Sequence, residues 1–208
     1  MWLPIIITLV VGYLLGNING SILVSKLIVH DDVRKHGSGN AGLTNFFRSY
    51  GGWNTLLVAA IDIGKAVAAC FIGGFLLKSY GYFDEGKMLG AVAVSLGHDF
   101  PALLKFKGGK GIMSGFAVAL VIDWRVGLLI FAVFALFYGI TKYVSLGSIL
   151  GAATFAVGFI VLHHDNLCLM LGGIFLGALA IFMHRANLMR LIKGTESKVY
   201  LTKKGRNK

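Results

Sequence analysis

The sequence predicts an all-α integral membrane protein, a bundle of seven transmembrane helices in a single domain that covers residues 1–208. Composition is the first reason: 56% of the 208 residues are hydrophobic and only 14% are charged, whereas soluble domains carry about 25% charged residues. The second reason is a series of apolar runs suited to helices, which pair their backbone N–H and C=O groups within the segment and can therefore lie in lipid.

Seven such runs follow one another along the chain: Leu3–Ile28, Trp53–Leu77, Lys87–His98, Ile112–Ile122, Val126–Ile140, Leu146–Leu162 and Leu167–Met183. A bilayer core needs about 20 residues of helix, so the third and fourth runs are short. They either extend into their flanks as full crossings or form the two halves of a re-entrant pair. In both cases the number of spans is odd, and the two termini lie on opposite sides of the membrane.

The distribution of Lys and Arg predicts which side is cytoplasmic. With the C-terminus inside, the inner segments are residues 30–50, 99–111, 141–145 and the tail 184–208, and they carry 15 of the 20 Lys and Arg residues. Cytoplasmic segments are enriched in these residues, so we expect the N-terminus outside and the C-terminus in the cytoplasm. The net charge of +11 thus reflects topology and membrane lipid rather than nucleic acid. Lys203 to Lys208 are interpreted as an orientation and headgroup signal.

The first inner segment reads GSGNAGLTNFFR, from Gly37 to Arg48. Its glycine spacing matches a dinucleotide-binding pattern, but that pattern requires a preceding β-strand, and here both neighbours are membrane helices. Closely spaced glycines let backbone N–H groups converge on an anion, and arginine adds a planar fork for phosphate. The candidate anion ligands are Gly37, Ser38, Gly39, Asn40, Gly42, Thr44, Asn45 and Arg48. A flexible glycine-rich loop is the alternative.

The second inner segment, GHDFPALLKFKGGKG, runs from Gly97 to Gly111. A P-loop needs glycine five places before its Gly-Lys pair and Ser or Thr after it. Leu104 and Gly111 occupy these two positions, so a nucleotide-hydrolysing P-loop is excluded. The remaining candidates for a second anion cradle are Lys107, Gly108, Gly109, Lys110 and Gly111. Alternatively, the lysines only enforce topology.

The third inner segment, HRANLMRLIKGTESK, follows the last apolar run. His184 and Asn187 are three residues apart and share a face on a helix, whereas Arg190 is expected to face lipid headgroups. Glu196 either accepts hydrogen bonds from basic residues of the site or is a strut between loops. Asp62 and Lys65, one turn apart inside the second apolar run, are expected to form a structural ion pair.

These three segments resemble the cytoplasmic motifs of the bacterial acyl-phosphate-dependent glycerol-3-phosphate acyltransferases, the PlsY family. The resemblance covers the whole chain, and the Asp62–Lys65 spacing matches a family D-x-x-K pattern, with Ala66 where a glycine is expected. It implies a multi-pass protein of the bacterial cytoplasmic membrane with its active site on the cytoplasmic side. The implied reaction moves a fatty acyl group from acyl phosphate to the 1-hydroxyl of glycerol 3-phosphate. Lysophosphatidate and phosphate are the products of this first step of phospholipid synthesis.

The resemblance also implies roles for individual residues. The expected catalytic residues are Ser38, Lys107, His184 and Asn187. The expected substrate-binding residues are Gly37, Gly39, Asn40, Gly42, Thr44, Asn45, Arg48, His98, Gly108, Gly109, Lys110, Gly111, Thr195 and Glu196. The base is either His184 or a phosphate oxygen of the acyl phosphate. We expect no acyl-enzyme, no cofactor and no metal, and the sequence makes no prediction of oligomeric state.

A transporter of a phosphorylated metabolite is the alternative from another functional class. Such a protein would use similar phosphate chemistry, but internal repeats and polar groups near the membrane midplane are typical of transporters. In this sequence no repeat relates the two halves, and the polar groups concentrate at one face. The acyltransferase is therefore the favoured interpretation.

Overall fold

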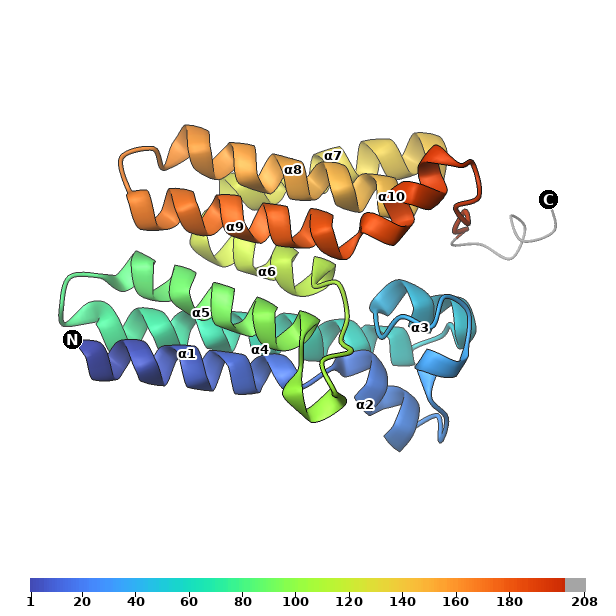
Figure 1. Cartoon of the computed structure of the whole chain (residues 1–208), viewed down its shortest axis with the longest axis horizontal. Coiled ribbons are helices and arrows are strands. Elements are labelled where there is room, and N and C mark those ends of the chain that lie inside the picture. The colour runs from blue at the N-terminus through green and yellow to red at the C-terminus, as the bar shows by residue number, and fades with distance from the viewer. Residues whose placement is uncertain (201–208) are drawn as a thin grey trace.

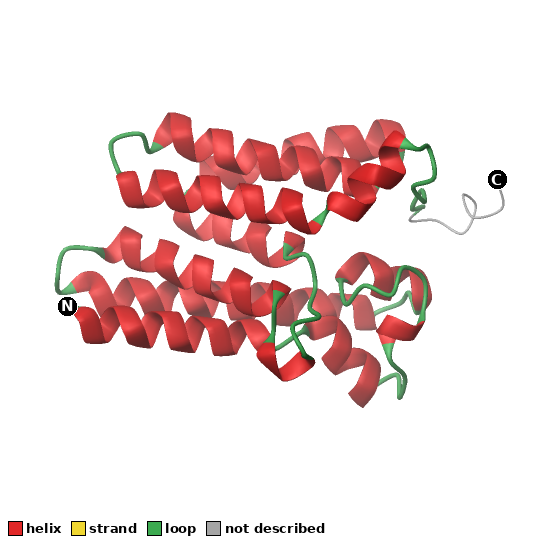
Figure 2. Ribbon diagram, viewed as in Figure 1, coloured by secondary structure: helices red, strands yellow, loops and turns green. Residues whose placement is uncertain are grey.

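The computed structural model describes residues 1–200, which form helices and loops without a β-strand (Figure 2). The long helices are α1 (Trp2–Asn17), α4 (Asn54–Lys78), α5 (Phe83–Asp99), α6 (Ile112–Ile122), α7 (Trp124–Thr141), α8 (Val144–Leu162) and α9 (Leu167–Met183). The short ones are α2 (Gly20–Leu27), α3 (Leu43–Ser49), α10 (Arg185–Ile192) and two 3₁₀ turns, η1 (Val33–Lys35) and η2 (Ala102–Leu104).

The long helices form one elongated bundle with two groups (Figure 1). Helices α1, α4 and α5 pack together on one side, α7, α8 and α9 on the other, and α6 contacts α4 and α7 between them. By length and composition, α4, α7 and α8 are able to cross a membrane. This number rises to five if each of two bent pairs counts as one span: α1 with α2, bent by 42°, and α9 with α10, bent by 57°.

Each predicted apolar run contains a helix, but the first run was wrongly treated as continuous. It breaks at Ile18 and Asn19, whose backbones are extended. The Asn19 side chain starts the new helix α2 by accepting a hydrogen bond from the Ile22 N–H at 3.0 Å. Its amide group also donates to the Ala41 carbonyl at 3.0 Å, which ties the break to the first polar loop. The third run extends further than predicted, from Phe83 to Asp99.

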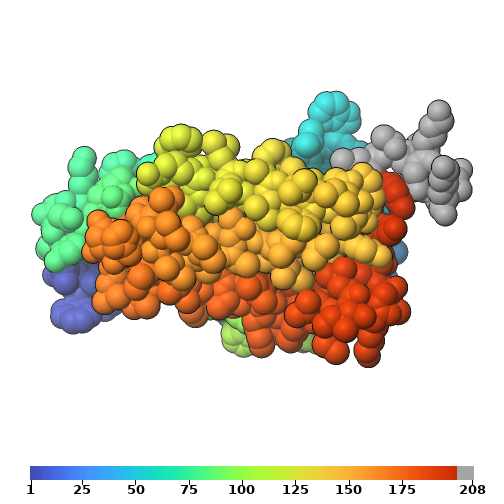
Figure 3. Space-filling view, turned by 90° about the horizontal axis from the view of Figure 1, so that it is seen from above, coloured from blue at the N-terminus to red at the C-terminus, as the bar shows by residue number. Residues whose placement is uncertain are grey.

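Both the interior and the surface of the bundle have features typical of a protein that lies in lipid. Glycines let α4 and α5 approach closely: a Cβ added to Gly73 would lie 2.1 Å from the carbonyl oxygen of Gly86. The buried ion pair predicted between Asp62 and Lys65 is confirmed at 2.8 Å. Figure 3 shows α7 and α8 at the surface of the bundle. Large apolar side chains of these two helices are exposed, among them Leu128, Leu129, Phe131, Leu136, Val157 and Val161.

Polar loops gather at one end of the bundle, and the N-terminus lies at the other (Figure 1). The segments 30–50, 99–111, 141–145 and 184–200 all lie at this end, together with α2, α3 and α10. The predicted headgroup signal, Lys203 to Lys208, lies outside the described residues. The structure thus brings the three sequence motifs together in space.

Candidate active site

A polar cavity of about 540 Å³ lies between the motifs. The predicted site residues that line it are Gly37, Ser38, Asn40, Gly42, Thr44, Asn45, Arg48, His98, Lys110, Gly111, His184, Asn187 and Glu196. The N-termini of α6 and α8 also border it, through Gly111 and Ile112 and through Val144 and Ser145. Helix N-termini carry partial positive charge and free N–H groups, so the cavity is built to receive anions.

The glycine loop is shaped by the side chain of Asn45, which is only 3% exposed. Its amide nitrogen donates to the carbonyls of Val33, His36 and Asn40, each at 3.0 Å. Its carbonyl oxygen accepts from the Ser38 N–H at 2.9 Å. Gly37 has a positive φ of 55°, and a Cβ there would lie 2.4 Å from the Asn45 oxygen. Asn45 therefore holds the loop that presents Ser38, instead of offering its own donors to an anion.

The second motif divides into residues that face the cavity and residues that support them. Gly108 and Gly109 do not line the cavity, because they pack behind it against the end of α5: a Cβ on Gly108 would lie 1.9 Å from the His98 carbonyl oxygen. Lys107 is exposed outside the lining. Lys110 lines the cavity and donates to the Asn187 side-chain oxygen. Of these two lysines, only Lys110 lines the cavity.

The third motif is organised by the carboxylate of Glu196. One oxygen accepts from Asn187 and from Ser145, each at 2.8 Å, and the other pairs with Arg190 at 2.7 Å. These hydrogen bonds lower the pKa of Glu196 against the opposing effect of burial. Glu196 is thus a strut that joins α8, α10 and the tail. Thr195 points elsewhere and is exposed.

Positive charge dominates the cavity. Arg48, Lys110 and Arg190 line it together with the carboxylates of Glu196 and Asp62, and Asp62 is already paired with Lys65. Burial, followed by repulsion from Arg190, lowers the pKa of Lys110 from 10.5 to about 8. The buried Nε of Arg48 has no hydrogen-bond partner among residues 1–200. An anion in the cavity would satisfy both groups.

His184 sits at the bend between α9 and α10 and is 4% exposed. Its Nδ1 lies 2.8 Å from the Ala180 carbonyl oxygen, which accepts only, so Nδ1 carries the proton and Nε2 has a free lone pair. Burial lowers the pKa of His184 to about 4. The ring is therefore neutral at pH 7 and presents an acceptor, which suits a substrate hydroxyl better than a phosphate oxygen.

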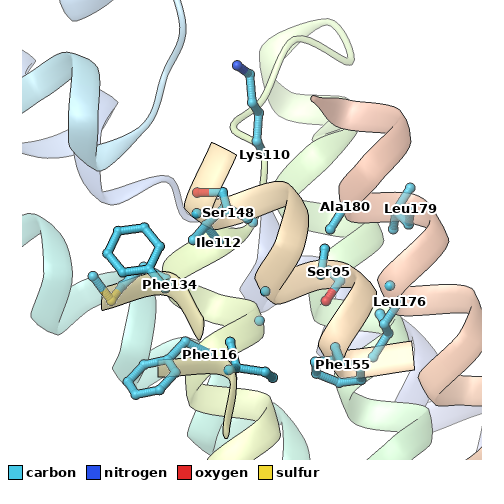
Figure 4. A pocket seen from close by; sticks show the side chains of 18 of the residues that line it. Ser95, Lys110, Ile112, Phe116, Phe134, Ser148, Phe155, Leu176, Leu179 and Ala180 are labelled. Carbon is cyan, nitrogen blue, oxygen red and sulfur yellow. The ribbon is translucent and has the colours of Figure 1, made fainter. Parts of the chain in front are cut away.

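The polar cavity continues into an apolar cavity of about 220 Å³ between α6, α7, α8 and α9 (Figure 4). Both cavities share Lys110, Gly111, Ile112, Met113, Phe134 and Ser148 in their linings. Figure 4 shows Lys110 at one end and Phe116, Phe155 and Leu176 towards the other. One continuous space thus has a cationic end and an apolar end.

Sequence reasoning placed Gly39, Lys107, Gly108, Gly109 and Thr195 in the site, but none of them lines the cavity. It missed Arg190, Ser145, Ser148 and Asp62, which do. Arg190 was expected to face headgroups, although it lies one turn after Asn187 on the same helix, a spacing that puts both on one face. The two serines had no such signal, because Ser145 lies in the predicted link 141–145 and Ser148 lies inside the apolar run Leu146–Leu162.

Comparison with known proteins identifies the arrangement. Residues 6–194 match the family model described as glycerol-3-phosphate acyltransferase. The chain belongs to this family. Relatives named glycerol-3-phosphate acyltransferase include one from Clostridioides difficile, 40% identical over 195 residues, which are 93% of this chain and 95% of the relative. Another, from Thermoanaerobacter pseudethanolicus, is 38% identical over 194 residues, again 93% and 95% of the two chains.

Two solved structures place the chain in the PlsY family of these acyltransferases. Both are crystal structures of PlsY, an integral membrane glycerol 3-phosphate acyltransferase. The glycerol 3-phosphate form has a TM-score of 0.85 at 31% identity, covering 94% of this chain and 96% of PlsY. The lysophosphatidic acid form has a TM-score of 0.81 at 30% identity, covering 94% and 95%. The family resemblance of the three motifs is confirmed.

The role of Asn45 in holding the glycine loop of this PlsY-family protein can be tested by substitution. Asn45→Asp keeps the size of the side chain but sets a carboxylate against three carbonyl oxygens, so the loop should open. We expect backbone amide exchange in residues 36–45 to rise by at least about tenfold, since an unsatisfied buried group costs 1–3 kcal/mol. Asn54→Asp, at the start of α4, is the matched control, because an acid at a helix N-terminus is tolerated. Equal protection in both variants would show that Asn45 does not organise the loop.

Proposed function

We propose that this protein transfers a fatty acyl group from acyl phosphate to the 1-hydroxyl of glycerol 3-phosphate, releasing lysophosphatidate and phosphate. The observation that carries the proposal is the continuous space with a cationic end and an apolar end. Acyl phosphate has this same polarity: a phosphate group joined directly to a long alkyl chain. Glycerol 3-phosphate is small and anionic and needs only the polar part.

The cationic cavity has ligands for two phosphate groups. We assign the acyl phosphate to Lys110, Gly111 and the N-terminus of α6, because these residues border both cavities. We assign glycerol 3-phosphate to Ser38, Arg48, Asn187 and His184 in the polar cavity. Lys107 receives no substrate contact in this assignment, since its side chain is exposed outside the lining.

The alkyl chain is proposed to enter the apolar cavity. Phe134 stands at its junction with the polar cavity, and Phe155 and Leu176 lie deeper (Figure 4). Small residues in the walls, such as Gly151 and Ala152, leave room for a chain between the helices. Burial of apolar surface contributes about 0.8 kcal/mol per CH₂ group, so this cavity would supply much of the binding free energy.

The reaction needs positioning more than covalent chemistry, because the acyl phosphate is already activated. The 1-hydroxyl oxygen attacks the acyl carbonyl carbon, the bond between this carbon and the phosphate oxygen breaks, and the electron pair leaves with phosphate. Lys110 and the α6 N–H groups stabilise the developing negative charge. No acyl-enzyme is formed.

The proton of the hydroxyl is proposed to pass to a phosphate oxygen of the acyl phosphate. Burial lowers the pKa of His184 to about 4, so its imidazole is a weak proton acceptor at neutral pH. The phosphate group of the acyl phosphate is joined directly to the carbonyl carbon that is attacked, so one of its oxygens lies close to the hydroxyl. His184 orients the hydroxyl by accepting its hydrogen bond at Nε2 and is not the final proton acceptor.

The proposed topology places the reaction at the cytoplasmic face of the bacterial inner membrane. The seven long helices would all run through the bilayer, α6 across only part of its thickness, with the N-terminus outside and the C-terminus in the cytoplasm. Its support is the gathering of the basic segments 30–50, 99–111 and 184–200 at one end of the bundle and the preference of Lys and Arg for the cytoplasmic side. The short α6, 11 residues or about 16 Å long, reaches only part of the way.

The activity is tested with purified protein in lipid, glycerol 3-phosphate and hexadecanoyl phosphate. We expect lysophosphatidate by mass spectrometry with equimolar phosphate release, and no product from hexadecanoyl-CoA. Ser38→Ala and Lys110→Ala should lower kcat/KM by at least about 100-fold, whereas Lys107→Ala should stay within about threefold. Uptake of glycerol 3-phosphate into proteoliposomes without product from either donor would instead identify a transporter.

The lowered pKa of Lys110 predicts a pH dependence. The amine is cationic below its pKa of about 8 and loses its charge as the pH rises through that value. Because kcat/KM reports the free enzyme, kcat/KM for acyl phosphate should fall above about pH 8, well before an ordinary lysine would titrate. Lys110→Arg should abolish this fall between pH 8 and 10. The rate of spontaneous hydrolysis of the acyl phosphate is subtracted at each pH. If kcat/KM of the unmodified protein then stays constant up to pH 10, the assignment of Lys110 is contradicted.

The apolar cavity predicts a chain-length effect. A Cβ on Gly115, which lines this cavity, would meet no atom of residues 1–200 within 4 Å. Gly115→Leu should therefore fill the cavity and lower kcat/KM for hexadecanoyl phosphate at least about tenfold relative to octanoyl phosphate. Gly139→Leu, equally unobstructed among the described residues but exposed on α7, is the matched control. An unchanged chain-length ratio in Gly115→Leu would place the chain elsewhere.

A further inference from the structure

The buried ammonium group of Lys65 joins three elements near the polar cavity. It donates to Asp62 Oδ1 at 2.8 Å and to the Ile18 carbonyl oxygen at 2.5 Å, and it lies 2.6 Å from His98 Nδ1. The Lys65 side chain is 3% exposed. An ammonium group has three N–H donors and no acceptor, so these three nearest partners can take all of them; the Gly16 carbonyl oxygen lies further away, at 3.5 Å. The carboxylate and the carbonyl accept hydrogen bonds only and therefore favour the charged form of Lys65, which donates to Nδ1.

This arrangement determines the proton position on His98. Since Lys65 donates to Nδ1, that nitrogen carries a lone pair, and the proton of the neutral ring is on Nε2. Hydrogen bonding at one ring nitrogen commonly selects the tautomer in this way. His98 therefore presents an N–H donor on the edge opposite to Lys65.

The Nε2 edge of His98 lies beside the polar cavity. His98 lines this cavity, and its Nδ1 edge is covered by Lys65. Gly109 packs against the ring from behind the cavity: a Cβ on Gly109 would lie 2.2 Å from Nε2, so any larger residue at this position would displace the ring. The Gly109 N–H donates to the His98 carbonyl oxygen at 3.1 Å, and this hydrogen bond holds Gly109 next to His98. Gly109, which sequence reasoning placed in an anion cradle, instead makes room for the His98 ring.

Asp62 completes the arrangement from the other side. Its Oδ1 also accepts from the Gly20 N–H at 3.2 Å. The Asp62–Lys65 pair therefore serves both ends of the break in the first membrane helix: the carboxylate binds the start of α2, and the ammonium group binds the Ile18 carbonyl after α1. A pair that only bridged the break would not need His98.

We propose that Lys65 is a positioning residue for acyl transfer, which holds His98 as the Nε2–H tautomer so that this N–H donates to a phosphate oxygen of a substrate in the polar cavity. The inference rests on the proposed function and adds two residues, Lys65 and Asp62, that act on substrate through His98. A neutral donor complements the cations Arg48 and Lys110, because it gives the phosphate a directional hydrogen bond without adding a buried charge. Either substrate phosphate has the required chemistry, and separate KM values distinguish them.

The test uses two amides that copy different halves of the imidazole. Glutamine places its terminal amide near the position of Nε2, whereas asparagine reaches only the position of Nδ1. We expect His98→Asn to raise KM for one of the two substrates at least about tenfold, the loss of one hydrogen bond to a charged group. His98→Gln should restore most of this loss. If His98 served only as a partner of Lys65, asparagine would be the better substitute, and this reversed order would overturn the proposal.

The role of Lys65 is tested in a charge-neutral background. The double variant Asp62→Asn with Lys65→Met removes the ion pair without leaving one buried charge unpaired, and it should show the same KM increase as His98→Asn. The matched control is Asp84→Asn with Lys87→Met, an ion pair of the same spacing and the same 2.8 Å distance on α5, distant from the polar loops; its KM values should not change. Equal KM values in both double variants would exclude a positioning role.

The tautomer is read directly by ¹⁵N NMR of protein labelled in the histidine rings, with His98→Gln identifying the His98 signals. We expect a protonated Nε2 and an unprotonated Nδ1 in the unmodified protein, and a loss of this fixed state in the Asp62/Lys65 double variant. A protonated Nδ1 would contradict the inference even in protein that is fully active. Absence of activity with acyl phosphate and glycerol 3-phosphate in the unmodified protein would instead overturn the proposed function.

Discussion

The break in the first membrane helix is the constraint on which the polar end depends. A broken helix leaves carbonyl and N–H groups without partners, which is costly in an apolar setting. The Lys65 ammonium group binds the Ile18 carbonyl, and the Asp62 carboxylate binds the Gly20 N–H. Because these groups are satisfied, α2 can leave the bundle and carry the glycine loop to the cavity. Asn19 fixes the loop to the break through Ala41.

The site separates groups that carry charge from groups that place them. Arg48 and Lys110 face the cavity as cations. Asn45 instead forms hydrogen bonds to the backbone, and Glu196 bonds to neighbouring side chains. Polar groups buried near lipid need complete sets of partners, so a loop that presents a phosphate ligand must be supported from behind. The proposed chemistry asks little of any single base, and the neutral His184 fits that requirement.

Particular residues show how far sequence reasoning reached. Long apolar runs predicted the helices, since lipid burial imposes a strong pattern, and the buried Asp62–Lys65 pair followed from their spacing of one helical turn. The break at Asn19 was missed although GNINGS, from Gly16 to Ser21, contains a local signal, since Asn is a favoured N-cap residue and Asn19 caps α2. A glycine in the sequence could serve either anion binding or close packing. Gly109 avoids crowding next to His98, a role that has no local signature. Ser145 lines the cavity and donates to Glu196, 51 positions away along the chain, a pairing that has no local signature.

A crystal or cryo-EM structure with glycerol 3-phosphate and a non-transferable acyl phosphonate tests the proposed site most directly. We expect the phosphonate within hydrogen-bond distance of Lys110, the alkyl chain in the apolar cavity beside Phe134, and the glycerol hydroxyl between His184 and the acyl carbonyl carbon. An alkyl chain on the outer, lipid-facing surface of the bundle, with Lys110 still bound only to Asn187, would contradict the proposed site.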